Sequence, residues 1–244
     1  MGFDESFGVL DPAVWTASYL PAWSSRVAAA AAFTVGAEGL TLSIPSHHPL
    51  WCPDRHPTPL RVSAIQSANR SGPVGSTDAP QPFQDGLLVR EQQPTVLGFT
   101  PHFGTIEVTC AANLSVRSMF SAWMVGLEDR PDRCGEICLF EVFGDTVDRG
   151  TAIIGQGIHP FRDPALREDF SARQHELDIT MAHTYAAHWQ PDRVDFSIDG
   201  AVTRSCSQAP DYPMMLILGL FDFPDRAGDS RHVPSMRVTR VRHH

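Results

Sequence analysis

The sequence contains no lysine, and its positive charge is carried by arginines that are scattered along the chain without forming a basic stripe. In 244 residues, 19 Lys plus Arg stand against 28 Asp plus Glu, which gives a formal net charge of −9 at pH 7. A surface of this charge repels the phosphate backbone of nucleic acids. The sequence therefore excludes nucleic acid as an expected partner.

Long apolar runs are also missing, and none approaches the ~20 residues that a membrane-spanning helix needs. The first residues after the initial methionine, 2–5, are acidic, whereas a secretory signal is basic and then apolar. These two absences predict no membrane partner and no signal peptide. Taken as given, the chain is therefore expected to be cytoplasmic.

Cysteines are few, and their number is odd. The five cysteines are Cys52, Cys110, Cys134, Cys138 and Cys206. An odd number in a domain of this size does not indicate a disulfide framework. We expect free, buried thiols.

Charged residues make up only 19% of the chain and hydrophobic residues 42%, with no long charge runs, no internal repeat and no linker. This composition excludes a disordered chain and a coiled coil, and it favours a single globular domain over residues 1–244. The 20 prolines and 18 glycines interrupt the sequence at short intervals. Such spacing is typical of many short strands joined by turns.

Alternation of apolar and polar residues predicts half-buried strands in three segments, at residues 33–44, 104–112 and 194–198. The first segment is expected to form a hairpin, and Asp199-Gly200 after the third is a two-residue turn signal. Residues 213–220 are almost continuously apolar, as in a strand covered on both faces. These patterns together predict an antiparallel β-sandwich.

The rest of the chain offers loops and one weak helix signal. Residues 47–59 are rich in proline and histidine, and residues 71–84 in glycine, serine and proline, so both are predicted to be long surface loops that carry binding groups. The alanines at 28–32 favour a helix, but five residues are too few for one to be stable unaided.

Two glutamates, Glu136 and Glu141, lie inside an otherwise apolar segment, residues 135–144. Burying an unpaired carboxylate costs several kcal/mol, so a compensating feature is expected. Side chains five positions apart on a regular strand point to opposite faces, and these two share a face only if a β-bulge accommodates one extra residue. The alternative is an edge strand whose glutamates are simply solvated.

With the bulge, Glu136, Cys138 and Glu141 would line one face of the sheet. Two carboxylates on one face can carry out retaining glycoside hydrolysis, in which one attacks the anomeric carbon and the other donates a proton. That mechanism needs a separation of roughly 5 to 5.5 Å between the carboxyl groups.

The motifs around these glutamates resemble those of glycoside hydrolase family 16. The family carries a Glu-x-Asp-x-x-Glu strand after a Trp-Met-Leu-Gly-like strand, and this chain has Trp-Met-Val-Gly at 123–126 and Gly-Glu-Ile-Cys-Leu-Phe-Glu at 135–141. Residues 183–200 are similar to the family's His-Thr-Tyr-Ala-x-x-Trp-x-Pro-Asp segment, which ends in Asp-Gly. Shorter matches at 3–15, 103–108, 157–159 and 213–218 extend the resemblance over nearly the whole chain.

The resemblance implies an all-β fold, a jelly-roll β-sandwich of two antiparallel sheets with a concave ligand cleft. It also implies that Glu136 is the nucleophile and Glu141 the general acid/base. Cys138 stands where the family has the aspartate that tunes them, and a thiol beside two carboxylates should have a raised pKa. The chain departs from the family pattern near the expected cleft at His188, Gly219 and Met119 as well.

Four further residues are candidates for contact with a sugar. Trp123 and Trp51 can stack on a pyranose ring or belong to the core, whereas Trp189 is expected in the core. The resemblance places His159 near the sugar or the acid/base, and the alternative is a hydrogen-bonded core histidine. His188 replaces an acidic residue of the family and is expected at the cleft.

No metal or other cofactor is expected. His47, His48, Cys52 and His56 match no established zinc-ligand spacing. Family members sometimes bind calcium on the convex face, but Thr239 stands where an aspartate would be expected, which weakens that site.

The expected function is therefore that of a retaining endo-glycoside hydrolase that cleaves a β-glucan, with β-1,3 or mixed β-1,3/1,4 linkages, by double displacement. Its partner would be a polysaccharide or oligosaccharide substrate, and a monomer is favoured. Because Cys138 replaces the aspartate, a hydrolysis-impaired sandwich repurposed for carbohydrate binding is the alternative. A cleft that serves a non-carbohydrate small molecule in the cytoplasm is a third, although family members are usually secreted.

Overall fold

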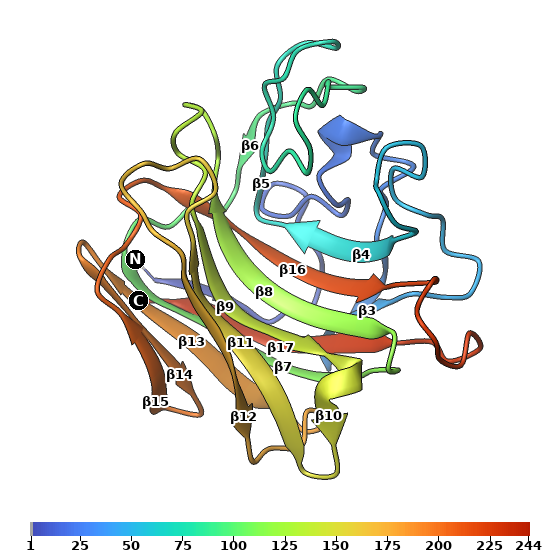
Figure 1. The fold of residues 1–244 in the computed structure, drawn as a ribbon, viewed down its shortest axis with the longest axis vertical. Coiled ribbons are helices and arrows are strands. Elements are labelled where there is room, and N and C mark those ends of the chain that lie inside the picture. The colour runs from blue at the N-terminus through green and yellow to red at the C-terminus, as the bar shows by residue number, and fades with distance from the viewer. Residues whose placement is uncertain (1) are drawn as a thin grey trace.

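Two large antiparallel sheets pack face to face in the computed structural model, which describes residues 2–244 (Figure 1). The predicted all-β jelly-roll sandwich is confirmed. The short strand β1 pairs with the last strand, β17, so both ends of the described chain lie in one sheet. None of the helices in the described part of the chain is long and apolar enough to cross a bilayer.

The first sheet, called the β7 sheet here, has eight strands in the order β15-β14-β13-β7-β17-β3-β2, with β1 beside β17. Its strands are β1 (Phe3–Glu5), β2 (Ala32–Gly36), β3 (Gly39–Ser43), β7 (Gly104–Asn113), β13 (His183–Gln190), β14 (Arg193–Ile198), β15 (Ala201–Cys206) and β17 (Ser235–His243).

The second sheet, the β9 sheet, has seven strands in the order β10-β11-β9-β8-β16-β4, with β12 beside β11. Its strands are β4 (Arg61–Gln66), β8 (Ser118–Gly126), β9 (Glu136–Phe143), β10 (Val147–Asp148), β11 (Thr151–His159), β12 (Asp169–His175) and β16 (Met214–Asp222). The remaining elements are β5 (Ala68–Asn69), β6 (Val96–Leu97) and the 3₁₀ turns η1 (Pro21–Trp23) and η2 (Gly144–Thr146).

The predicted hairpins are present. Strands β2 and β3 pair in register over residues 32–43, one residue from the predicted bounds of 33–44, and β14 and β15 are joined by Asp199-Gly200. Both turn residues have positive φ, 50° and 80°, as a tight hairpin turn requires. Residues 28–32 form no helix, because Ala30 instead makes a β-bridge to Ser18.

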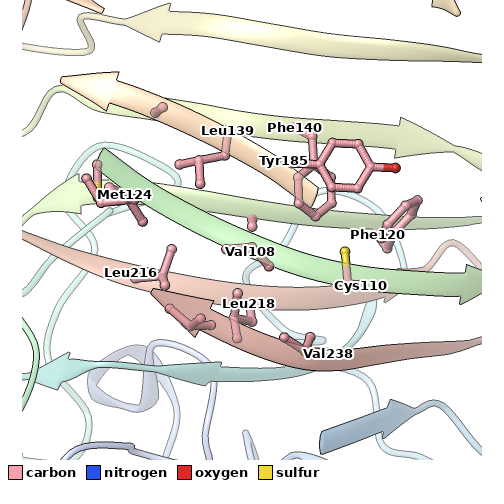
Figure 2. Packing of buried hydrophobic residues seen from close by; sticks show 14 of the residues in the cluster. Val108, Cys110, Phe120, Met124, Leu139, Phe140, Tyr185, Leu216, Leu218 and Val238 are labelled. Atoms are coloured by element: carbon pink, nitrogen blue, oxygen red, sulfur yellow. The ribbon is translucent and has the colours of Figure 1, made fainter. Parts of the chain in front are cut away.

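The main core lies between the two sheets, where alternate side chains of each strand point inward. Figure 2 shows part of it, with Val108 and Cys110 of β7, Phe120 of β8 and Phe140 of β9. The ring of Phe140 lies 4.2 Å from that of Tyr185 on β13, so aromatic contacts link the sheets. All five cysteines are buried and free, as predicted.

The β9 sheet is covered on both faces. In β16, Met214, Leu216 and Leu218 belong to the main core, while Met215 and Ile217 belong to a second apolar cluster on the other face. This explains the continuous apolar run at residues 213–220. The second cluster is completed by the segment before β4 and the loops after it, which gather beside the β4 edge in Figure 1. These loops narrow the open face of the sheet.

A buried ion pair joins the end of β16 to its neighbours. Arg117 donates from Nε to Oδ1 and from Nη2 to Oδ2 of Asp222, each at 2.6 Å, and Arg61 donates to Oδ2 at 3.1 Å. The side chains of Arg117 and Asp222 are only 7% and 6% exposed. Removing one partner of such a pair leaves the other charge buried without compensation.

The variant Asp222→Ala is therefore expected to lower the free energy of unfolding by about 3–5 kcal/mol, measured by urea denaturation. The matched control is Asp4→Ala, which removes a carboxylate paired with Arg240 on the solvent-exposed side of the β7 sheet. A surface pair contributes little, so the control should unfold close to wild type. Equal losses in the two variants would contradict this account of Asp222.

Candidate active site

Strand β9 contains the β-bulge that the two glutamates require. Against β8, Phe140 pairs with Ala122 and Cys138 pairs with Trp123, so Leu139 is an extra residue. The register with β11 shifts in the same place. Leu139 and Phe140 both point into the main core. The alternation is thereby reset, and Glu136 and Glu141 lie on the same face of the sheet.

That face forms the floor of a cleft with a cavity volume of about 230 Å³. This is slightly smaller than the roughly 300 Å³ at the lower end of typical ligand pockets. Its walls are largely aromatic, and its polar lining includes three carboxylates. The aromatic residues are Tyr19, Trp51, Phe83, Trp123, Phe161 and Phe221, and the carboxylates are Glu128, Glu136 and Glu141. Aromatic faces beside acidic groups suit a ligand that has both apolar C–H faces and hydroxyl groups.

The surroundings of the Glu136 carboxyl group favour its neutral form. Burial raises its pKa from 4.5 to about 8, and the negative charges of Glu141 and Glu168 act in the same direction. A hydrogen bond from Gln81 opposes them. Because the two glutamates interact, their protons are expected to leave in two steps that belong to the pair.

Glu141 is half-buried on the same face, and burial raises its pKa too, while the nearby His159 lowers it. Opposite Glu141 on β11 is Gly155. A Cβ atom at Gly155 would lie 2.8 Å from Cγ of Glu141 and 2.4 Å from Cζ of Phe170. Glycine at position 155 thus leaves the space in which the Glu141 side chain lies.

Cys138 lies between the two glutamates, and its side chain is only 2% exposed. Burial, Glu136 and Glu141 all raise the pKa of its thiol well above the usual value. The group is therefore neutral at physiological pH and supplies no third negative charge. It lies beneath the cleft and not among the side chains that line the cavity.

Trp123 and Trp51 both line the cleft, although only 5% and 4% of each residue is exposed. Their rings contact Tyr19 at 6.3 Å and 4.9 Å between centroids, so the three aromatic rings form one wall. Gly219 lies close to this wall, because a Cβ atom there would come within 2.9 Å of the rings of both Trp123 and Phe221. A side chain at this position, such as the asparagine expected from the resemblance, would require Trp123 or Phe221 to shift.

The two predicted histidines lie in different places. His159 pairs with Glu136 across β11 and β9, at the edge of the cleft face. Its Nδ1 lies 2.9 Å from Glu168, its ring stacks on Phe170 at 4.6 Å, and it does not line the cavity itself.

The prediction for His188 is wrong. This residue is on β13 in the β7 sheet, where its neighbours Ala187 and Trp189 point into the core. The side chain of His188 therefore points outward and is exposed, and it bonds Thr105 at 2.8 Å. Trp189 is a core residue, as predicted, and donates to the carbonyl of Pro210.

Within residues 2–244, no group of three or more His, Cys, Asp or Glu side chains is arranged to hold a metal ion. Of the loop residues considered for zinc, His48 bonds the carbonyl of Val62 and His56 that of Thr58. At the position considered for calcium, the Thr239 hydroxyl donates to the carbonyl of Thr109. These groups have protein partners and do not form a set of metal ligands.

Several cleft residues were not identified from the sequence. Gln81, in the predicted loop at 71–84, donates to Glu136 at 2.9 Å. Glu128 lies in the loop between β8 and β9, and it is buried beside Arg162. The composition of residues 71–84 indicated that this loop carries binding groups, but no periodic pattern indicates which residue of a loop reaches the cleft.

Comparisons with known proteins agree with this architecture. The model of "Glycosyl hydrolases family 16" matches residues 98–232. A GlcNAcα1-4Gal-releasing endo-β-galactosidase from Clostridium perfringens is 24% identical with a TM-score of 0.83, over 99% of this chain and 61% of that one. This chain thus spans less than two thirds of that protein.

Two laminarinase structures share the fold at lower similarity. The catalytic domain from Thermotoga maritima is 16% identical with a TM-score of 0.66, over 99% of this chain and 96% of that one. The endo-1,3-β-glucanase from Thermotoga petrophila is 15% identical with a TM-score of 0.63, over 98% of this chain and 95% of that one. The comparison with curated proteins found no match.

The substitution Glu141→Gln is expected to lower the pKa of Glu136, because it removes the neighbouring negative charge that disfavours ionisation. Carbon-13 NMR of labelled glutamate carboxyl groups would follow the titration. Glu38→Gln, an exposed change on the other sheet, serves as the control and should leave Glu136 unaffected. A wild-type Glu136 that titrates near 4.5, or one that is insensitive to Glu141→Gln, would refute this description of the site.

Proposed function

The chain belongs to glycosyl hydrolase family 16, and from this premise we propose that it is an endo-acting enzyme that cleaves β-linked polysaccharides with retention of anomeric configuration. The observation that supports the proposal is the bulge in β9, which brings Glu136 and Glu141 to the same face of one cleft. Two carboxylates that flank a glycosidic bond are the minimal machinery of double displacement.

In the proposed mechanism Glu136 acts in its ionised form and attacks the anomeric carbon, while Glu141 gives its proton to the leaving glycosidic oxygen. The glycosidic bond breaks and an ester between Glu136 and the sugar forms. Glu141, now ionised, takes a proton from a water molecule that attacks the same carbon and releases Glu136. The aromatic wall of Trp123, Trp51 and Tyr19 would support the sugar face and exclude bulk water.

For the substrate we propose a β-glucan with β-1,3 or mixed β-1,3/1,4 linkages. The supporting observations are the sequence motifs that carry the family resemblance and the likeness of the fold to two laminarinases.

A second candidate substrate is a glycan that contains β-linked galactose. It is favoured by the TM-score of 0.83 to the clostridial endo-β-galactosidase, against 0.66 and 0.63 for the laminarinases. Both candidates use the same two carboxylates and differ only in the sugar that the cleft accepts.

Purified protein is expected to release reducing ends from at least one of laminarin, lichenan, agarose, carrageenan and a β-galactoside glycan. Glu136→Gln should abolish turnover because the nucleophile is lost, and Glu141→Gln should lower kcat by about 10²–10⁴-fold because general acid catalysis is lost. Proton NMR of the first products should show the anomeric configuration of the substrate.

The exposed change Glu38→Gln is the matched control and should retain full activity. Activity on none of the five substrates, or equal activity in wild type and Glu136→Gln, would overturn the proposal. Binding of these glycans without turnover would instead support the carbohydrate-binding alternative that Cys138 suggested.

A further inference from the structure

One side chain from outside the β9 sheet reaches the proposed nucleophile. Nε2 of Gln81 donates to Oε2 of Glu136 at 2.9 Å, although the two residues are 55 positions apart. Gln81 lies in the loop between β5 and β6 and lines the cleft. Within residues 2–244, this is the one side-chain hydrogen bond that the Glu136 carboxyl group accepts.

The orientation of the Gln81 amide is fixed by Trp123. The indole Nε1 of Trp123 can only donate, and it donates to Oε1 of Gln81 at 3.2 Å. The NH₂ group of the amide must therefore face Glu136. Gln81 thus presents a donor to the carboxylate, and it accepts a bond from the tryptophan that forms the cleft wall.

The peptide group between Pro80 and Gln81 is anchored at both its N–H and its carbonyl. The Gln81 N–H donates to Oε1 of Glu128 at 2.6 Å, and Trp23 donates from Nε1 to the carbonyl of Pro80 at 2.8 Å. Glu128 is itself buried and paired with Arg162.

The backbone of Gln81 also adopts an unusual conformation. It has φ of 49°, in the left-handed region that non-glycine residues rarely adopt. Such a conformation persists only where the surroundings enforce it, and such residues cluster at active sites and ligand clamps.

The charged and titratable groups around Glu136 do not account for stabilisation of its ionised form. They are Glu141 and Cys138 on β9, His159 on β11, Glu168 before β12, and Tyr19, His56, Glu128 and Arg162 in the cleft. Glu141 and Glu168 repel the ionised form of Glu136, and the Cys138 thiol is neutral. The Arg162 guanidinium is already paired with Glu128. Gln81 is the neighbour whose hydrogen bond favours the form that attacks.

We propose that Gln81 is a positioning residue that orients and stabilises the Glu136 carboxylate for attack, through a hydrogen bond donated from the loop between β5 and β6. This inference rests on the proposed function, because it assigns Glu136 the role of nucleophile. The loop is then part of the catalytic apparatus as well as a wall of the cleft.

The test compares Gln81→Met, which keeps the length of the side chain but removes the donor, with Gln81→Glu, which replaces the donor by a second carboxyl group. For Gln81→Met, kcat/KM near neutral pH is expected to fall about 10- to 100-fold, with the loss mainly in kcat. The acidic limb of the pH profile should move to higher pH, because Glu136 loses the bond that favours its ionised form. Gln81→Glu should move the limb further in the same direction.

Gln84→Met is the matched control, since Gln84 lies in the same loop but does not line the cleft beside Glu136. It should leave both kcat and the pH profile unchanged. Urea unfolding of each variant would separate a loss of loop structure from the positioning effect. If Gln81→Met proved too unstable, Gln81→Glu retains the acceptor for Trp123 and carries the test.

An unchanged acidic limb in Gln81→Met or Gln81→Glu, with wild-type activity intact, would overturn the inference. If the proposed function is wrong, the result is different: the wild-type protein itself cleaves none of the glycans. In that case carbon-13 NMR of the Glu136 carboxyl still tests the hydrogen bond, because its pKa should be higher in Gln81→Met than in wild type. No difference there would also overturn the inference.

Discussion

Two consecutive apolar side chains, Leu139 and Phe140, both point into the core, and the cleft depends on this irregularity. In a regular strand one of them would point outward, at the cost of an exposed apolar side chain and an unfilled space in the core. Because β8 and β11 both accommodate the extra residue, the alternation of β9 is reset after it. Glu141 consequently returns to the face that already carries Glu136. Core packing between the sheets thus determines the geometry of the proposed catalytic pair.

The same arrangement creates an electrostatic difficulty. Two acidic groups lie on a sheet whose outer face is covered by aromatic side chains, and burial favours their neutral forms. The neighbouring cation, Arg162, is paired with Glu128, and the residue between the two glutamates is a neutral thiol. The Glu136 carboxylate is therefore supported by a neutral donor from a loop. A neutral donor favours the ionised carboxylate less than a cation would, so the pKa values of the Glu136 and Glu141 pair stay high. Such a pair can hold one proton and release it during the reaction.

The sequence predicted the sandwich and the hairpins, because both rest on a period-two pattern that the pleat of a strand imposes. That pattern alone puts Glu136 and Glu141 on opposite faces, so their shared face could be predicted only on the condition that a β-bulge lies between them. It was wrong about His188, since a motif that resembles a family segment does not by itself show which face of which sheet its polar residues occupy. It could not identify Gln81 or Glu128, because their positions depend on contacts between loops that are distant in sequence. It also gave no indication that Gly155 and Gly219 leave space for Glu141 and Trp123, since that role is visible only once the neighbouring strands are in place.

Double displacement in this cleft requires that the bulge in β9 bring the carboxyl groups of Glu136 and Glu141 to a particular separation. A high-resolution crystal structure of the wild-type protein with an oligosaccharide in the cleft would measure that separation directly. We expect both groups on the cleft face, roughly 5 to 5.5 Å apart, one on each side of the bound glycosidic bond. Carboxyl groups on opposite faces of β9, or a separation of about 6.5 to 9.5 Å as in inverting enzymes, would contradict this expectation.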